Sequence, residues 1–386
     1  MKKNFTALIF LTVILSCVTK TYAQDLNAIQ TVVPFLSIAP DSRSGGMGDA
    51  GVATSPDVYS NHWNPAKFAF IDGNGGVGIS YSPWLRNLVP DINIAYLSGY
   101  YRIDNKQVTS ASLLYSSLGD VPFTDDFGNL ERTFKPNELA FDVAYSRKFT
   151  DNFSGGVAFR FIYSNLTGGS YSGGAATKPG TSFAADISGY YHKDIKFMSK
   201  DALIGLGFNF SNIGSKMSYS DDQTSDFIPM NMRLGAAGTL NLDNFNKLTL
   251  TIDLNKLLVP TPPVYNADLE IVDGMDPNVS VPVAIFHSFY DAPGGFGEEI
   301  REITYSFGTE YWYNNQFALR AGYFHENETK GNRKYFTAGA GFKLKGFTLD
   351  FSYLMPVAQN HPLARTLRFS LSFDSTSLRN VVTSSQ

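Results

Sequence analysis

The sequence has 386 residues, with 31 basic and 35 acidic side chains and a formal net charge of −4 at pH 7. This acidic balance argues against nucleic-acid binding, which requires a basic surface. The chain contains 31 phenylalanines, 21 tyrosines and 34 glycines, and its one long apolar run lies at the N-terminus, so helical membrane spans are excluded beyond it. Such a composition favours a β-barrel in which apolar and polar residues alternate.

The first 23 residues have the features of a secretory signal peptide. Lys2 and Lys3 precede an apolar stretch over residues 5–18, and a small-residue cleavage site ends at Ala23. Removing this peptide takes away three lysines and no acidic residue, which leaves a net charge of −7. Lipidation at Cys17 is the alternative to cleavage after Ala23. Cleavage would leave a mature chain without cysteine, and therefore without disulfide or thiol chemistry.

The segment from residue 24 to residue 75 has neither helical periodicity nor strand alternation. Its central part, Arg43–Ala66, is rich in glycine and alanine and contains no phosphate-binding glycine motif. We expect this segment to lie on the periplasmic side as a plug inside a barrel, where its backbone polar groups can pair with a polar wall. The candidate plug residues are Gly45, Gly46, Gly48, Asp49, Asn64, Pro65 and Ala66.

Residues 76–374 contain about fourteen runs with the alternation typical of β-strands. Between Leu248 and Asn255, for example, leucine and isoleucine alternate with threonine, aspartate and asparagine. The expected strands lie at 76–83, 91–102, 107–118, 137–149, 153–166, 181–195, 203–213, 230–241, 247–257, 301–313, 316–327, 333–344, 347–355 and 364–374. Most are long enough to cross a bilayer at a tilt.

The connections between these strands, numbered in chain order, alternate in length. The even-numbered connections are short, such as 150–152, 314–315 and 345–346, or slightly longer at 196–202. Most odd-numbered connections are long, namely 119–136, 167–180, 214–229 and a loop of about forty residues at 258–300. Short periplasmic turns alternating with long external loops are the signature of a bacterial outer-membrane barrel. The predicted fold class is therefore an all-β transmembrane antiparallel β-barrel of about fourteen strands, followed by a periplasmic tail at 375–386.

Two of the long loops contain apolar residues that face the cell exterior in this topology. These residues are Val121, Phe123 and Phe127 in the first loop, and Val281, Val283, Ile285, Phe286 and Phe289 in the second. Exposed apolar residues usually indicate a partner or a ligand. The alternative is that the loops fold inward and bury these side chains over the mouth of the barrel.

The sequence contains no GxSxG, HExxH or CxxC motif and no EF-hand loop. We therefore expect no enzymatic activity, no catalytic residue, no metal site and no cofactor. A barrel-embedded lipid A deacylase would require a serine and a histidine side by side at the membrane interface, and nothing in the sequence marks such a pair.

Two stretches of the N-terminal segment carry a resemblance to known proteins. Gly48–Ala53 and Asn64–Ala66 resemble the plug of FadL-type outer-membrane barrels, a family with fourteen strands. Residues 34–85, in which Ser42–Gly48 precedes the run Trp63–Lys67, resemble more specifically the PorV (LptO) family of the Bacteroidetes type IX secretion system.

The resemblance implies a multi-pass protein of the cell outer membrane, surrounded by outer-membrane lipid. It would bind exported substrates through their C-terminal signal domains at a SprA-like translocon barrel. It would then carry them to a PorU-like, sortase-type attachment protein. The alternative is a FadL-like channel for hydrophobic small molecules, and the sequence leaves this choice open.

Overall fold

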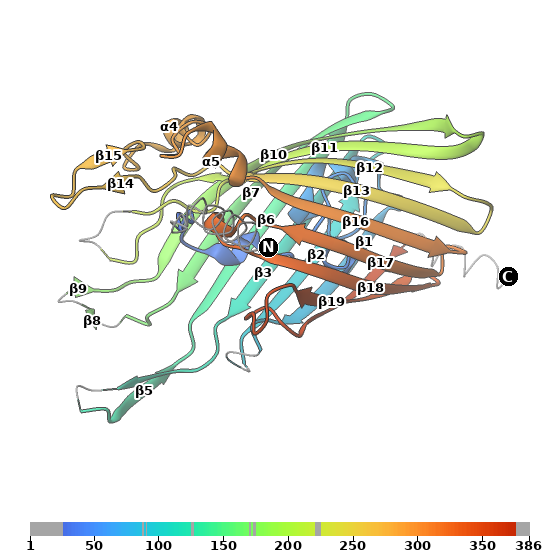
Figure 1. Ribbon diagram of the computed structural model, residues 1–386. Coiled ribbons are helices and arrows are strands. Elements are labelled where there is room, and N and C mark those ends of the chain that lie inside the picture. Colours follow the sequence, from blue (N-terminus) through green and yellow to red (C-terminus); the bar gives the residue numbers. More distant parts are fainter. Residues whose placement is uncertain are drawn as a thin grey trace, which may run out of the picture.

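The computed structural model describes residues 26–375, apart from residues 87, 88, 90, 125, 126, 170, 173, 174 and 221–224. The expected signal peptide and the tail beyond Ser375 lie outside the described residues. Fourteen antiparallel strands form a closed barrel (Figure 1), which confirms the predicted fold class. No helix in the described ranges is long and apolar enough to cross a membrane.

The barrel strands pair with their neighbours in chain order, and β20 closes the barrel on β1. They are β1 (Gly75–Pro83), β2 (Asn93–Arg102), β3 (Gln107–Ser117), β6 (Asn137–Lys148), β7 (Phe153–Asn165), β10 (Gly180–Phe197), β11 (Lys200–Gly214), β12 (Asn231–Asn241), β13 (Asn246–Leu257), β16 (Thr304–Tyr313), β17 (Phe317–His325), β18 (Lys334–Leu344), β19 (Phe347–Pro356) and β20 (Thr366–Asp374). Each expected strand coincides with one of these to within a few residues.

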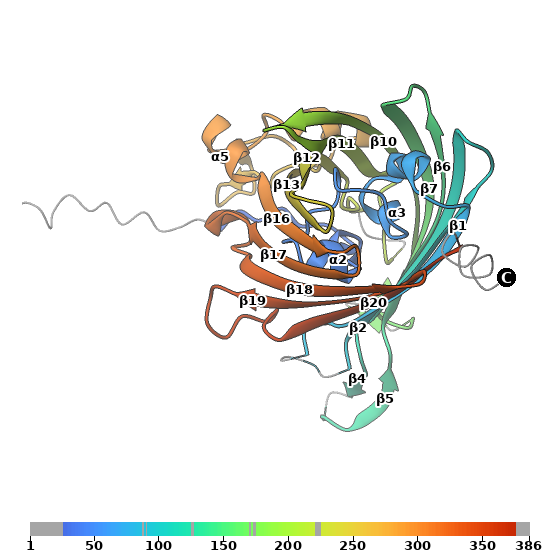
Figure 2. The ribbon, with the colours of Figure 1, turned by 90° about the vertical axis from the view of Figure 1, so that its right-hand side faces the viewer.

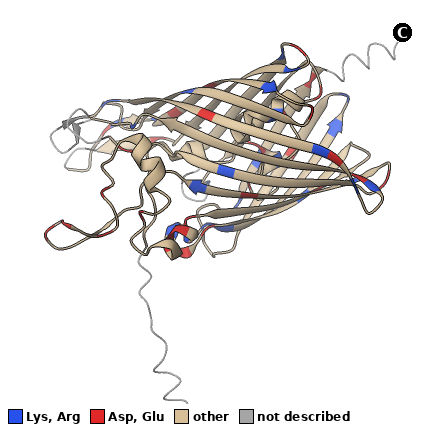
Figure 3. Ribbon diagram, turned by 90° about the horizontal axis from the view of Figure 1, so that it is seen from above, with Lys and Arg blue, Asp and Glu red and all other residues tan. Residues whose placement is uncertain are grey.

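The two faces of the barrel wall differ in chemistry because side chains alternate along each strand. On β13, Leu250 and Ile252 are exposed on the outside, whereas Thr251 and Asp253 are buried in the lumen. Charged positions are sparse along the strands (Figure 3). This outward apolar face forms the band that meets lipid in a membrane barrel.

Tight hairpins connect the strands at one end of the barrel, which we call the short-turn end. Asn314 and Asn315 both have a φ of 51°, and Gly346 follows Lys345 in the same left-handed region. The β10–β11 hairpin is tighter than expected, because Met198 and Ser199 adopt φ values of 49° and 64° and close a two-residue turn. The strands therefore extend through residues that the sequence assigned to a longer connection.

The long connections gather at the opposite end, which we call the long-loop end (Figure 1). They contain three hairpins that project from the barrel: β4 (Val121–Thr124) with β5 (Leu130–Phe134), β8 (Tyr171–Ser172) with β9 (Ala175–Ala176), and β14 (Val264–Tyr265) with β15 (Ile271–Asp273). They also contain α4 (Val281–His287), α5 (Phe296–Arg301) and η3 (Glu328–Lys330). The forty-residue connection thus has more regular structure than the sequence indicated.

The N-terminal segment folds into short helices inside the ring of strands (Figure 2). They are η1 (Pro34–Ser37), α2 (Ser42–Gly45), α3 (Ser60–Trp63) and η2 (Pro65–Phe70). Side chains cap two of them: Asp41 accepts a hydrogen bond from the Ser44 amide, and Asn64 accepts one from the Ala66 amide. Pro65 suits the first turn of η2 because that position needs no amide donor.

The first described residues of this segment lie at the long-loop end. The Asn27 amide donates to the Thr329 carbonyl over 3.0 Å, and its side chain donates to the Pro262 carbonyl over 3.1 Å. The chain then passes through the lumen to Gly75, where β1 begins at the short-turn end. The expectation that this whole segment lies on the side of the short turns therefore does not hold for its first described part, because contacts with distant loops hold that part at the other end.

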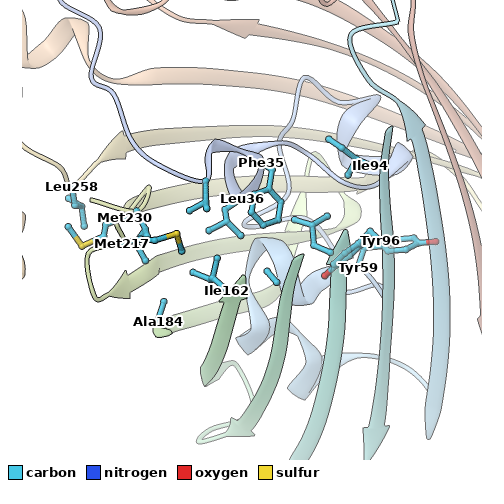
Figure 4. Packing of buried hydrophobic residues seen from close by; sticks show 14 of the residues in the cluster. Phe35, Leu36, Tyr59, Ile94, Tyr96, Ile162, Ala184, Met217, Met230 and Leu258 are labelled. Carbon is cyan, nitrogen blue, oxygen red and sulfur yellow. The ribbon is translucent and has the colours of Figure 1, made fainter. Parts of the chain in front are cut away.

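An apolar cluster covers the lumen on its long-loop side. Phe35 and Leu36 of the N-terminal segment are buried together with Met217, Met230 and Leu258 from the long connections (Figure 4). Burial of this surface attaches the N-terminal segment to the loops as well as to the wall.

The packing of the plug predicts that valine substitutions at two glycines of the wall have different effects. A Cβ atom at Gly322 would overlap the backbone of Met47 and Gly48, whereas one at Gly238 would meet no atom within 4 Å. We expect Gly322→Val to displace the plug, with a cost of about 1–3 kcal/mol for overpacking, and to make the outer membrane permeable to antibiotics. Gly238→Val is the matched control and should leave permeability and heat-modifiable migration unchanged. Equal behaviour of the two variants would contradict a packed plug.

Candidate functional site: the plugged lumen and the long-loop end

A buried arginine ties the plug to the barrel wall. Arg43 of α2 donates to both carboxylate oxygens of Glu310, from Nε over 3.0 Å and from Nη2 over 2.8 Å. Its Nη1 donates to Asp57 over 2.8 Å, which also fixes the following loop of the plug. Bidentate charge-assisted pairs of this kind combine strength with a defined orientation.

The same charge network continues along the wall. Glu310 on β16 also accepts from Arg320 Nε over 2.7 Å, and Arg320 Nη1 donates to Asp350 over 2.7 Å. The side chains of this network are at most 10% exposed apart from Asp57. The strands β16, β17 and β19 and the plug are therefore linked by ion pairs. Loss of one member would leave its buried partner uncompensated.

The candidate plug residues in the first half of the motif lie against the β16–β20 wall. Gly48 has a φ of 70° and its amide donates to Thr337 Oγ1 over 2.9 Å. A Cβ at Gly45 would lie 2.6 Å from Arg368 Nη1, and one at Gly46 would lie 3.3 Å from the Gly339 backbone. Asp49 accepts a hydrogen bond from the Tyr335 hydroxyl over 2.5 Å. The three glycines allow close backbone approach, and Gly48, like Asp49 with a φ of 62°, adopts a left-handed conformation.

The remaining candidate plug residues contact the strands β6, β7 and β10. Asn64 donates to the carbonyls of Val52 and Gly189, each over 3.0 Å. The Pro65 carbonyl accepts from Ser146 Oγ over 2.8 Å, and the Ala66 carbonyl accepts from Ser154 Oγ over 2.7 Å. The two halves of the motif are thus held by different parts of the wall.

Sequence reasoning missed the charged residues that anchor the plug. Asp253 accepts from the amides of Gly51 and Val52 over 2.7 and 2.9 Å, and Arg43 pairs with Glu310 as described above. A charge at an inward position of an alternating strand was the available signal for Asp253 and Glu310. Their partners in the plug could not be inferred from that alternation.

Two cavities flank the plug within the described part of the chain. One, of about 310 Å³, is lined by residues that include Asp49, Arg233, Glu302 and Arg333. The other, of about 750 Å³, is lined by Arg43, Glu310 and other side chains of the short-turn half of the lumen. Charged side chains contribute to both linings, and the first cavity is also lined by apolar side chains such as Ile29, Trp63 and Phe324.

An ionic cluster holds the connection 258–303 to the barrel. Lys256 donates to Glu299 over 2.9 Å and to Glu302 over 2.6 Å. Lys330 donates to Glu298 over 2.5 Å and to Glu302 over 2.9 Å. These five side chains are at most 10% exposed, so the base of this connection is fixed.

Asp291 lies beside this cluster and is 1% exposed. One of its oxygens accepts from the Thr261 amide over 3.2 Å. Burial, together with the nearby carboxylates of Glu299 and Glu302, raises the pKa of Asp291 to about 6.

The structure divides the expected partner-binding residues into two groups. Exposed side chains are Val121, Phe127, Val283, Phe286 and Phe289, with Phe127 at 90% and Phe286 at 70%. Val281 and Ile285 are half-buried and pack against the apolar cluster. Phe123 is also half-buried, with the Arg132 guanidinium 4.8 Å from its ring centroid. Some of these residues therefore fold inward, as the alternative expected, and the others face outward, where binding of a partner stays a prediction.

The hairpin β14–β15 presents further exposed apolar residues that sequence reasoning did not single out. Leu269 is 82% exposed and Val272 is 59% exposed, and Val264, Tyr265 and Ile271 are also exposed. The strands of this hairpin contain two and three residues, which is too short for alternation to be recognised.

Among the residues that the structure describes, no group of three or more His, Cys, Asp or Glu side chains could hold a metal ion. The Tyr323 hydroxyl lies 3.2 Å from His325 Nδ1 near the end of β17. The main features of the described residues are buried ion pairs, a packed plug and exposed apolar side chains on the loops.

The closed fourteen-stranded barrel with helices in its lumen is a FadL-like outer-membrane barrel. The toluene transporter TodX of Pseudomonas putida is 12% identical, with a TM-score of 0.51 over 91% of this chain and 99% of that chain. A second TodX structure is 14% identical, with a TM-score of 0.49 over 85% and 95%. A Pseudomonas aeruginosa FadL homologue is 12% identical, with a TM-score of 0.43 over 90% and 99%. At these identities the likeness concerns the fold alone.

The family of the type IX secretion system protein PorV matches residues 21–264, which is more than half of the chain. The chain therefore belongs to the PorV family and is an outer-membrane component of type IX secretion. This confirms the resemblance seen in the sequence. The match includes the plug and the strands β1–β13, while α4 and α5 lie beyond it. No curated protein sequence matches the chain.

The ionic cluster predicts that Lys330 stabilises the connection 258–303. In Lys330→Met, Glu298 loses its lysine partner while remaining buried, which should cost about 3 kcal/mol or more. We expect protease to cleave this connection faster, while the barrel itself stays folded. Lys196→Met is the control, because it breaks a pair with Asp201 whose side chains are 71% and 68% exposed and should cost no more than about 1 kcal/mol. Equal cleavage in both variants would argue against a cluster that fixes the loop.

The raised pKa of Asp291 predicts that the stability of the docked connection 258–303 depends on pH. Its folded pKa of about 6 lies above its usual value, so docking of the connection is favoured in acid and loses stability as the pH rises through about 6. Asp291→Asn removes this cost and should slow proteolysis at neutral pH, with a smaller advantage at about pH 5. The ratio of cleavage rates for variant and parent measures the effect, and a ratio independent of pH would contradict the assignment.

Proposed function

We propose that this barrel is the carrier that binds exported substrates by their C-terminal signal domains at a SprA-like translocon barrel and delivers them to a PorU-like, sortase-type attachment protein. Its short-turn end faces the periplasm and its long-loop end faces the exterior, following the loop lengths of outer-membrane barrels. The carrier is not an enzyme in this proposal, because binding and release suffice for its task. The observation that carries the proposal is the apolar surface of the projecting hairpins, joined to membership of the PorV family.

The hairpin β14–β15 is the part of this surface best suited to hold a folded domain. Leu269 and Val272 are exposed at 82% and 59%, in a hairpin that projects from the barrel (Figure 1). Exposed apolar groups on a soluble loop are costly unless a partner covers them. Removal of an apolar anchor from the centre of an interface costs about 2 kcal/mol or more.

The ionic cluster of Lys256, Lys330 and their glutamate partners fixes the base of the connection that carries this hairpin. Thr261, three residues before β14, donates to Glu302 over 2.6 Å. A preorganised surface binds without a large loss of conformational freedom, so a small contact area can reach useful affinity. A small area also allows release, which a carrier requires. The hairpin β4–β5, with Val121, Phe127 and Leu130 exposed, offers a second contact at the same end.

The alternative is a FadL-like channel for hydrophobic small molecules. Passage of such a solute requires an apolar path through the lumen. The bidentate pair between Arg43 and Glu310 fixes the plug across the lumen, and the flanking cavities carry charged side chains. These observations support the carrier over the channel.

The hairpin predicts a secretion phenotype for Leu269→Asp combined with Val272→Asp. Introducing two charges should weaken cargo binding by about 30-fold or more, the equivalent of about 2 kcal/mol, and surface attachment of secreted proteins should fall. Met198→Asp is the matched control, since Met198 is 80% exposed but lies in a turn at the opposite end. Heat-modifiable migration verifies that each barrel assembles.

Three measurements on the double variant separate the hypotheses. Loss of surface attachment with unchanged uptake of a hydrophobic solute supports the carrier. Unchanged secretion with altered uptake supports the channel, and an altered lipid A acylation pattern would support a deacylase. Normal secretion by a correctly assembled double variant would remove the β14–β15 hairpin from the cargo site.

A further inference from the structure

The helix α4 is apolar on two faces, and only one of them is packed. Val281, Ala284 and Ile285 belong to or pack against the apolar cluster beneath the helix. Val283 and Phe286, together with Phe289 just beyond the helix, are exposed at 38%, 70% and 44%. A helix that is apolar all round is normally covered on all sides, either by protein or by membrane. Protein or membrane should therefore also cover the exposed face of α4.

The position of Lys256 shows on which side of the wall this region lies. On β13, Thr251 and Asp253 point into the lumen, so the alternation places Lys256 on the outward face together with Leu250 and Ile252. Lys256 is nevertheless only 4% exposed. Its ammonium group is covered by Glu299 and Glu302 at the end of α5, and it lies 6.0 Å from the ring centroid of Phe289. The end of α5 and Phe289 thus reach the outward face of β13 at the rim of the barrel, where Glu302 also borders the luminal cavity of about 310 Å³.

The outward-facing residues next to Lys256 also lie near the α4–α5 region. Met232 of β12 is its register partner, and Met232 and Phe210 of β11 are half-buried against the apolar cluster that Val281 and Ile285 also contact. Figure 2 shows α5 beyond the ends of β13 and β16, on the outer side of the ring of strands. The region beneath the exposed face therefore borders the outward side of β11–β13 at the rim, where the lipid-facing band ends.

The helix α5 also exposes apolar side chains. Phe296 and Ile300 are 78% and 45% exposed, and their spacing of four residues places them on one side of the helix. Arg301 follows and is exposed. Aromatic and aliphatic side chains next to a basic residue are typical of segments that lie at a membrane interface.

We propose that the outward face of α4 and α5 is immersed in the outer leaflet of the membrane and extends the lipid-facing band over the rim of the barrel. We define this face by its exposed apolar residues, Val283, Phe286, Phe289, Tyr290, Phe296 and Ile300. Acyl chains of the outer leaflet cover it, and the β14–β15 hairpin remains above the lipid for other contacts. Of the expected partner-binding residues, Val283, Phe286 and Phe289 are then lipid contacts. This inference does not depend on the proposed carrier function.

Site-directed spin labelling tests the proposal in the full-length chain. Cys17 is the single cysteine of the sequence, so a Cys17→Ser background allows one label at a time. Labels are introduced through Phe286→Cys and Phe296→Cys, and through Leu269→Cys as the control on the hairpin, where the parent side chain is 82% exposed. Each purified variant is reconstituted into phosphatidylcholine vesicles, and its folding is verified by heat-modifiable migration.

The readout is the collision rate of each label with oxygen, which concentrates in lipid, relative to a water-soluble nickel chelate. We expect the ratio of oxygen to nickel collisions to be severalfold higher for labels at Phe286 and Phe296 than for the label at Leu269. Equal, nickel-accessible labels at all three positions would place the face in water and overturn the proposal. Labels at Phe286 and Phe296 shielded from both reagents would show that protein, such as a second copy of the chain, covers the face, and would also overturn it. The secretion phenotype of the hairpin variant is measured separately, so failure of either proposal leaves the other intact.

Discussion

The bidentate pair between Arg43 and Glu310 is the interaction on which the inside of this barrel depends. A wall that turns its apolar residues toward lipid turns its other residues into the lumen, and here these include Glu310, Arg320 and Asp350. Buried charges are costly without partners. The plug supplies the missing charge through Arg43, and the wall in turn gives the plug a fixed place. Neither part could be packed in this way alone.

The same constraint explains where small residues occur. The backbone of Met47 and Gly48 passes so close to β16 and β17 that side chains at Gly308 and Gly322 would overlap it. Glycine on both sides allows the plug to donate hydrogen bonds directly to wall side chains such as Thr337. Beside the plug, cavities of about 310 and 750 Å³ remain in the described part of the lumen.

A second set of ion pairs determines the shape of the long-loop end. Lys256 and Lys330 hold three glutamates around the base of the connection 258–303. This base fixes a projecting hairpin and two short helices, which present apolar surface to different surroundings. The hairpin carries Leu269 away from the barrel, whereas the exposed face of α4 lies beside the lipid-facing band. In the two proposals made above, this one connection serves both a partner in solution and the surrounding membrane.

The sequence by itself determined the strands and the sorting of the loops. Alternation is a local property with a period of two residues, so β13 could be recognised from Leu248–Asn255 without knowledge of any other segment. The glycines of the plug were recognisable as well, because close packing and left-handed backbone both select glycine, as at Gly48.

Only the tertiary structure decided which charges pair and which apolar faces are covered. Arg43 and Glu310 are 267 residues apart, and no local pattern connects them. The first residues of the N-terminal segment lie at the long-loop end because Asn27 bonds to Pro262 and Thr329, again across a large sequence separation. In α4, all residues from Val281 to Phe286 are apolar, so periodicity could not distinguish Ile285, which packs inward, from Phe286, which faces out. That distinction depends on the neighbours that the folded barrel places on each side of the helix.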